Sequence, residues 1–135
     1  MTTVTASIVV TSDHSLVSTV NEDLRERTKR FAIRILRLYR ALPPKEDARV
    51  IGRQLLRSGT SVGANYRAAC RARSRAEFIA KLGVVLEESD ESLFWLELLL
   101  EGEIIREEQL RALITEAKEL TSIFVTSLRT AKRVS

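Results

Sequence analysis

Apolar residues recur at alternating intervals of four and three along most of this chain, and this spacing limits the available folds more than any other feature. From Asn21 onward the apolar positions are Leu24, Phe31, Ile35, Leu38 and Leu42, with Thr28 filling the gap. Such spacing puts apolar side chains on one stripe of a helix, which other helices must cover. Only two prolines and five glycines occur in 135 residues, so long helices are favoured over a many-turned fold.

Residues that start and stop helices divide the periodic sequence into four segments. Asn21 is a suitable N-cap for the first helix, and Pro43 cannot continue that helix. Residues 74–77, Ser-Arg-Ala-Glu, form a capping box that starts the third helix after a tight turn. Gly102 suits the C′ position at the end of that helix. The first expected helix runs from Asn21 to about Leu42, and the second from Pro44 or Lys45 to the turn near residues 72–74. The third runs from the capping box at Ser74 to near Gly102, and the fourth from about Arg106 to Lys132.

Four long helices with short links predict an all-α fold, an antiparallel up-and-down four-helix bundle over residues 21–135. Residues 1–20 are expected to be a disordered or loosely ordered leader. The turn near residue 73 also predicts a register, because facing residues of the second and third helices should have numbers that sum to about 147. Arg57 should therefore lie beside Asp90 or Glu91.

Several residues of the second helix depart from what an apolar seam needs. Gly59 and Gly63 each weaken a helix by about 1 kcal/mol relative to Ala, which suggests close approach of another backbone, with a kink as the alternative. Ser58 and Asn65 occupy positions on the expected seam. Because buried polar groups need partners, we expect Ser58 and Asn65, with Arg57 beside them, to fix the helix register. A ligand site between helices is the alternative.

The chain contains little that could support catalysis or bind a metal. It has one histidine, His14, and one cysteine, Cys70. No Cys or His cluster has metal-ligand spacing, no glycine-rich phosphate loop follows a strand, and no E-x-x-H motif of di-iron bundles occurs. We expect a non-enzymatic protein without catalytic residues, cofactor or metal. No apolar run of about 18 residues predicts a membrane span, and a cytoplasmic location is expected.

Positive charge is concentrated in the first half of the chain. Residues 22–81 contain 16 Lys and Arg against 6 Asp and Glu, whereas residues 82–135 contain 6 against 11. Arginine binds phosphate oxygens in a bidentate geometry, and phosphate contacts dominate sequence-independent affinity for nucleic acids. The residues expected to contact RNA or DNA are Arg30, Arg34, Arg37, Arg67, Arg71, Arg73, Arg75 and Lys81. Alternatively, the arginines pair with the acidic third helix and the protein is a scaffold for other proteins.

The stretch LFWLELLL carries more apolar surface than one bundle core can cover. The residues expected to form an interface between subunits are Phe94, Trp95, Leu98 and Leu99. A fully enclosed helix is the alternative.

The second and third helices also contain a recognisable set of residues. They are Gln54, Arg57, Ser58, Ser61, Val62, Asn65, Tyr66, Arg71, Ser74, Glu77 and Phe78, followed by Lys81, Leu82, Glu87, Glu88, Glu91, Phe94, Trp95 and Leu96. This set resembles the signature of the bacterial four helix bundle proteins, which include proteins encoded in intervening sequences of 23S rRNA genes. The resemblance covers about residues 22–132. Ala68 and Ala69 stand where many members have Glu-Gly.

This resemblance implies a homopentamer of four-helix protomers around a central pore, with a basic surface. Relatives of the family include the accessory variability determinants of diversity-generating retroelements, which bind a reverse transcriptase and nucleic acid. Together with the basic surface, this leads to the hypothesis of a non-enzymatic, homo-oligomeric accessory or adaptor protein that contacts RNA or DNA, with a protein scaffold that binds no nucleic acid as the alternative. Its expected partners are other copies of itself, RNA or DNA, and a protein such as a reverse transcriptase.

Overall fold

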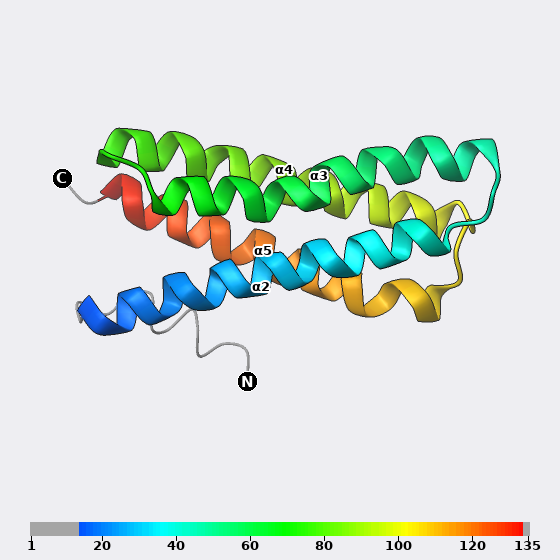
Figure 1. Ribbon diagram of the computed structural model, residues 1–135, viewed down its shortest axis with the longest axis horizontal. Coiled ribbons are helices and arrows are strands. Elements are labelled where there is room, and N and C mark those ends of the chain that lie inside the picture. The colour runs from blue at the N-terminus through cyan, green and yellow to red at the C-terminus, as the bar shows by residue number, and fades with distance from the viewer. Residues whose placement is uncertain (1–13, 134–135) are drawn as a thin grey trace.

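The computed structural model describes residues 14–133, which form four helices and three short links (Figure 1). The helices are α2 (His14–Ala41), α3 (Glu46–Cys70), α4 (Arg75–Glu101) and α5 (Glu107–Arg133). Successive helices run in opposite directions and pack against each other, while α2 and α5 close the bundle with a looser contact. The predicted all-α four-helix bundle is confirmed.

The first helix starts earlier than the sequence predicts. It begins at His14, so Asn21 lies inside the helix and does not cap it. Extending an existing helix by one residue costs much less than nucleating a new one, so a helix anchored by its packed part can continue through residues of modest propensity. The leader expected over residues 1–20 therefore overlaps the helix. Residues 1–13 lie outside the described residues.

The turn between α3 and α4 lies where the capping box predicts it. The Ser74 Oγ accepts a hydrogen bond from the Glu77 N–H at 3.0 Å, and the Glu77 carboxylate accepts one from the Arg73 N–H at 2.8 Å. These two bonds satisfy backbone donors that a helix start otherwise leaves unpaired. The capping box is confirmed.

The C-terminal end of α4 differs from the prediction by one residue. Gly102 is the C-cap with φ −80°, and the left-handed residue is Glu103, with φ 59°. The Ile104 N–H donates to the Leu99 carbonyl and the Glu103 N–H to the Leu100 carbonyl, both at 3.0 Å. This is the Schellman pattern, which requires a left-handed residue at the position after the C-cap, and here that position falls on a glutamate.

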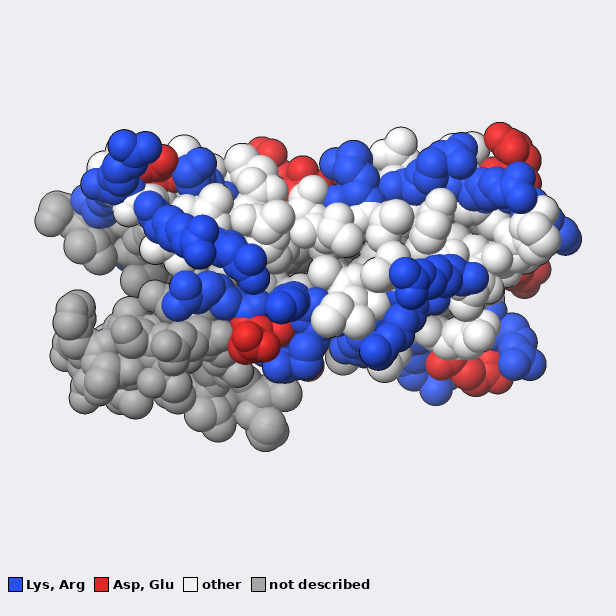
Figure 2. All heavy atoms as spheres, in the orientation of Figure 1, with Lys and Arg blue, Asp and Glu red and all other residues white. Residues whose placement is uncertain are grey.

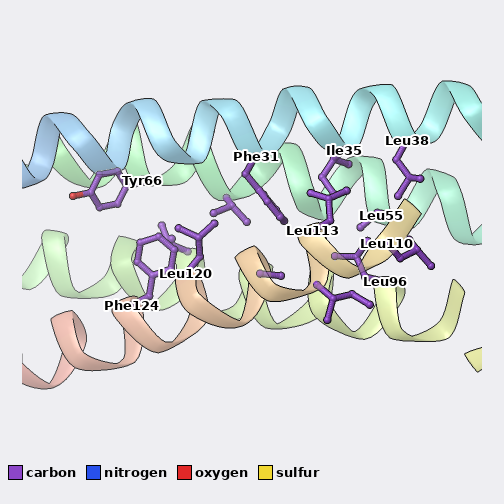
Figure 3. Packing of buried hydrophobic residues seen from close by; sticks show 14 of the residues in the cluster. Phe31, Ile35, Leu38, Leu55, Tyr66, Leu96, Leu110, Leu113, Leu120 and Phe124 are labelled. Atoms are coloured by element: carbon purple, nitrogen blue, oxygen red, sulfur yellow. The ribbon is translucent and has the colours of Figure 1, made fainter. Parts of the chain in front are cut away.

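The apolar stripes of the four helices meet in one core that runs along the bundle (Figure 3). Its largest fully buried side chains include Phe31, Ile35, Leu55, Leu96, Leu120 and Phe124. On α3 the seam contains Tyr66, which is 3% exposed and packs against Phe124 with ring centroids 5.8 Å apart. Asn65, which the periodicity placed on the seam, is only half-buried. The seam drifts by one position because the aromatic body of Tyr66 fills the core better than an amide.

The contact between α2 and α3 depends on glycine. A Cβ at Gly63 would lie 3.3 Å from the Thr28 carbonyl oxygen, and a Cβ at Gly59 would lie 2.9 Å from Ile35 Cγ1. Thr28 is fully buried in this contact, and its hydroxyl donates to the Leu24 carbonyl at 2.8 Å. The predicted close approach of another backbone is confirmed, and the approaching backbone is that of α2.

We expect Gly59→Ala to lower the free energy of unfolding by about 1 kcal/mol, because the overpacking against buried, β-branched Ile35 exceeds the gain in helix propensity. Gly83→Ala is the matched control, since a Cβ at Gly83 meets nothing within 4 Å. That change should raise the free energy of unfolding by about 0.5–1 kcal/mol. Urea unfolding followed by circular dichroism measures both. Equal stabilisation by the two changes would contradict close packing of α2 on α3.

Candidate nucleic-acid interface

Some of the arginines are paired with carboxylates of neighbouring helices. Arg27 of α2 places its Nε 2.7 Å from Glu116 Oε2 and its Nη2 2.6 Å from Glu119 Oε1, both on α5. Its side chain is 12% exposed. The hydrogen bond with Glu116, more than any other contact, raises the pKa of the Arg27 guanidinium, while burial acts in the opposite direction. Arg27 therefore stays charged and ties α2 to α5.

A second pairing joins α3 to α4. Arg57 Nη1 lies 3.3 Å from Glu88 Oε1, and its Nη2 contacts the Glu91 carboxylate. Glu91 is one of the two neighbours that the predicted register assigns to Arg57, so the register is confirmed. Because the Arg57 side chain is 49% exposed, these pairs fix the alignment of the helices more than they stabilise the fold.

Cations from α2 and α3 gather along the groove between these two helices. One part of the groove is lined by Arg25, Lys29, Ala32, Thr60, Gly63, Ala64 and Arg67, and an adjoining hollow by Arg25, Glu26, Arg67 and Arg71. We call Arg25, Lys29, Arg67 and Arg71 the groove cations. Within the described residues none of the four takes part in a salt bridge. Figure 2 shows this face of the molecule, where Lys and Arg far outnumber Asp and Glu.

The residues predicted to contact nucleic acid do not form one site. Arg67 and Arg71 line the groove. Arg30, Arg34 and Arg37 continue the row of Arg27 at intervals of three and four residues. Since Arg27 contacts α5, this row lies on the side of α2 turned away from the groove. The structure therefore separates the predicted residues, because Arg67 of α3 and Arg71 at its C-cap line the groove, whereas the row on α2 lies on the opposite side of that helix.

The remaining three predicted residues lie near the α3–α4 turn. The Arg75 guanidinium donates to the Ala131 carbonyl at 3.0 Å and to the Lys132 carbonyl at 3.4 Å, so it caps the C-terminal end of α5. The Arg73 side chain is exposed and Lys81 is half-buried on α4. None of the three lines the groove.

The sequence analysis missed Arg25 and Lys29 as site residues. Their spacing of four places them in one row of α2, and this signal was available. The row could not be assigned to the α3 side without knowing which neighbour flanks each edge of the apolar stripe. The structure shows that neighbour to be α3, since Arg25 and Lys29 line the groove together with Thr60 and Gly63.

The buried hydroxyl groups connect helices rather than form a ligand site. Ser92 Oγ donates to Ser58 Oγ at 3.0 Å, and the Ser89 and Thr121 hydroxyls lie 2.7 Å apart. These pairs bridge α3 to α4 and α4 to α5, which agrees with the register role expected for Ser58. Asn65 instead donates to the Ser61 carbonyl of its own helix at 2.9 Å. Asn65 therefore bridges no helices through this bond.

Large apolar side chains are exposed on both α3 and α4. Phe94 is 53% exposed, Val50 45% and Leu98 36%. Trp95 is half-buried beside Phe94, with ring centroids 4.9 Å apart, and its Nε1–H donates to the Glu91 carboxylate at 2.9 Å. We call Val50, Phe94, Trp95 and Leu98 the apolar patch. Leu99 was wrongly predicted to join such a surface, because its side chain is fully buried in the core.

The described residues offer little reactive chemistry. They contain no group of three or more His, Cys, Asp or Glu that could hold a metal ion. Burial raises the pKa of the half-buried Cys70 thiol, while a hydrogen bond from Tyr66 and the charge of Arg25 oppose that shift. A raised pKa leaves less thiolate at neutral pH, so Cys70 is a poor nucleophile. None of the described helices is both long and apolar enough to span a membrane.

The chain is similar to known proteins both in sequence and in fold. Residues 21–126 match the model of the 23S rRNA-intervening sequence protein family. The chain is also similar to a protein of unknown function from the S23 ribosomal protein family of Bacteroides thetaiotaomicron, whose crystal structure is known. The two are 38% identical, with a TM-score of 0.75, over 81% of this chain and 97% of that one. No curated protein matches the chain.

We expect Arg27→Gln to lower the free energy of unfolding by about 1–3 kcal/mol, because Glu116 is left largely buried without its charged partner. Arg30→Gln is the matched control, an exposed residue one helical turn away. It should change the free energy of unfolding by less than about 0.5 kcal/mol. Urea unfolding measures both, and an indistinguishable effect of the two substitutions would argue against a stabilising tie between α2 and α5.

Proposed function

Because the chain belongs to the 23S rRNA-intervening sequence protein family, we propose that it is a non-enzymatic, homo-oligomeric accessory protein whose α2–α3 groove contacts the phosphate backbone of nucleic acid. The unequal pairing of its arginines is the observation that carries this proposal. Arg27 and Arg57 each meet two glutamates of another helix. Within the described residues the groove cations form no salt bridge, and Glu26 is the acidic residue that lines the adjoining hollow with them.

Cations on adjacent helices that have no anionic partner repel each other. Such repulsion is relieved when an anion lies between them, and the loss of bound counterions from nucleic acid adds to the affinity. Arg25 and Lys29 come from α2, whereas Arg67 comes from α3 and Arg71 from its C-cap, so the groove can contact a phosphate chain from both sides. Arg30, Arg34 and Arg37 also form no salt bridge within the part of the chain that the structure describes, but their row lies on a single helix.

The groove presents charge and few groups that could distinguish bases. Binding through phosphate contacts is independent of sequence and depends strongly on salt. The protein would therefore act as a general nucleic-acid-binding accessory, with any specificity supplied by a partner protein.

We also propose that copies of the chain associate through the apolar patch. Large side chains exposed as a group on α3 and α4 are typical of a subunit interface, and Trp95 and Phe94 are of the kinds enriched there. The resemblance implies five copies. A ring would present the groove several times, and linked sites bind a long nucleic acid more tightly than one site alone.

The first prediction concerns the groove. We expect wild-type protein to bind a generic fluorescent single-stranded RNA at low salt, with affinity that falls as salt rises. The triple change Arg25→Gln, Arg67→Gln and Arg71→Gln removes three phosphate contacts, which should make the slope of log K against log salt shallower by about 2. Fluorescence anisotropy across a salt series measures both.

The matched control is the triple change Arg30→Gln, Arg34→Gln and Arg37→Gln, which removes the same charge from the other side of α2. It should affect the salt slope much less. Equal effects of the two triple variants would assign binding to net charge instead of the groove. Absent binding at low salt, or a flat salt response, would favour the alternative function of a protein scaffold.

A further prediction concerns the apolar patch. Phe94→Ser should reduce the mass of the assembly toward the 15.2 kDa of one chain, because it removes the most exposed large apolar side chain from the interface. The helical circular dichroism should not change, since Phe94 is not in the core. Light scattering after size-exclusion chromatography gives the mass, and a wild-type protein that is itself monomeric would refute self-association.

A further inference from the structure

We propose that a hollow at the far end of the α2–α3 face stacks an unpaired nucleobase on Tyr39, so that the groove selects single-stranded nucleic acid. The inference rests on the proposed function and names the form of nucleic acid that the groove takes. The hollow lies where α2 joins α3 and is lined by Tyr39, Arg40, Leu42, Pro43, Pro44 and Arg49.

The Tyr39 ring is held in place by α3. A Cβ at Gly52 would lie 3.2 Å from Tyr39 Cδ1 and 3.4 Å from Cε1, so the ring rests directly on the helix at a residue without a side chain. Gly52 is buried, whereas Tyr39 is half-buried and also borders the hollow. The ring is therefore oriented before any ligand arrives, which lowers the entropic cost of stacking on it.

The groups around the ring suit a nucleotide better than they suit a simple anion. Arg40 and Arg49 can contact a phosphate or lie over a base, while Leu42, Pro43 and Pro44 supply apolar surface. Sites for single-stranded nucleic acid combine cations that follow the backbone with aromatic rings on which bases stack. A phosphate group alone has no planar face that could stack on the ring. A base pair inside a duplex is already stacked on both faces, so only an unpaired base can stack on Tyr39.

Helical periodicity places the hollow and the groove cations in one continuous track. On α2 the row runs from Arg25 and Lys29 through Ala32 and Leu36 to Tyr39, at intervals of four and three residues. On α3 a parallel row connects Arg49 to Arg67, which lie about 27 Å apart at about 1.5 Å rise per residue. A flexible strand following this track would meet cations at both ends and an aromatic ring at one.

The test uses a single-stranded RNA of about 12 nucleotides, without internal pairing, and a duplex of the same length. We expect the full chain to bind the single strand about tenfold more tightly than the duplex, and Tyr39→Leu to abolish that preference while duplex binding is kept. Tyr39→Phe, which retains the ring, should behave as wild type. Circular dichroism establishes that the variants keep their helices.

A measurement on the wild-type protein makes the test independent of any substitution. With 2-aminopurine placed at each position of the RNA in turn, at least one position should lose fluorescence on binding as its base stacks on the ring. Absence of quenching, or unchanged single-strand affinity in Tyr39→Leu, would overturn the inference. If the inference is overturned but the groove-cation triple variant still loses RNA binding, the proposed function stands without the stacking site. If neither the single strand nor the duplex binds at low salt, the inference and the proposed function are both wrong.

Discussion

The close approach of α2 to α3 is the contact on which the candidate site depends. Gly59 and Gly63 remove the side chains that would hold the two helices apart, and Ile35 and Thr28 occupy the space. The same contact brings rows of cations from two helices to the edges of one groove. The glycines reduce the intrinsic stability of α3, and the buried Ile35 and Thr28 offset that cost through packing.

The distribution of carboxylates separates structural arginines from available ones. Acidic residues of α4 and α5 meet Arg27 and Arg57, where they align helices. Arg75 aligns in another way, by donating to the last carbonyls of α5. On the face that Figure 2 shows, Lys and Arg outnumber Asp and Glu. Fold stability and the proposed binding therefore draw on different members of the same arginine-rich sequence.

The features predicted correctly were those that depend on local sequence. Residues 74–77 mark a helix start wherever they occur, and the spacing of Phe31 and Ile35 defines a stripe without reference to any neighbour. The register between α3 and α4 also followed, because a short turn leaves little freedom. From these signals the sequence predicted the fold class, the pairing of Arg57 and the approximate positions of the helices, except for the start of the first helix.

The features missed were those that depend on which helix lies beside each edge of a stripe. Ser89 and Ser92 were not expected in the core because a hydroxyl there requires a partner on another helix. Leu99 and Leu98 are adjacent leucines, and only the packed structure shows which one is buried. Arg25 and Tyr39 could likewise be assigned to the proposed binding surface only after the structure showed that α3 lies beside them.

The most direct test of the groove as the binding surface is photo-crosslinking of wild-type protein to RNA that carries 4-thiouridine, followed by mapping of the attached peptides. We predict attachment within α2 and α3, in peptides that border the groove and the Tyr39 hollow. Attachment confined to α4 and α5 would contradict the central claim that cations brought together by the α2–α3 contact hold the nucleic acid.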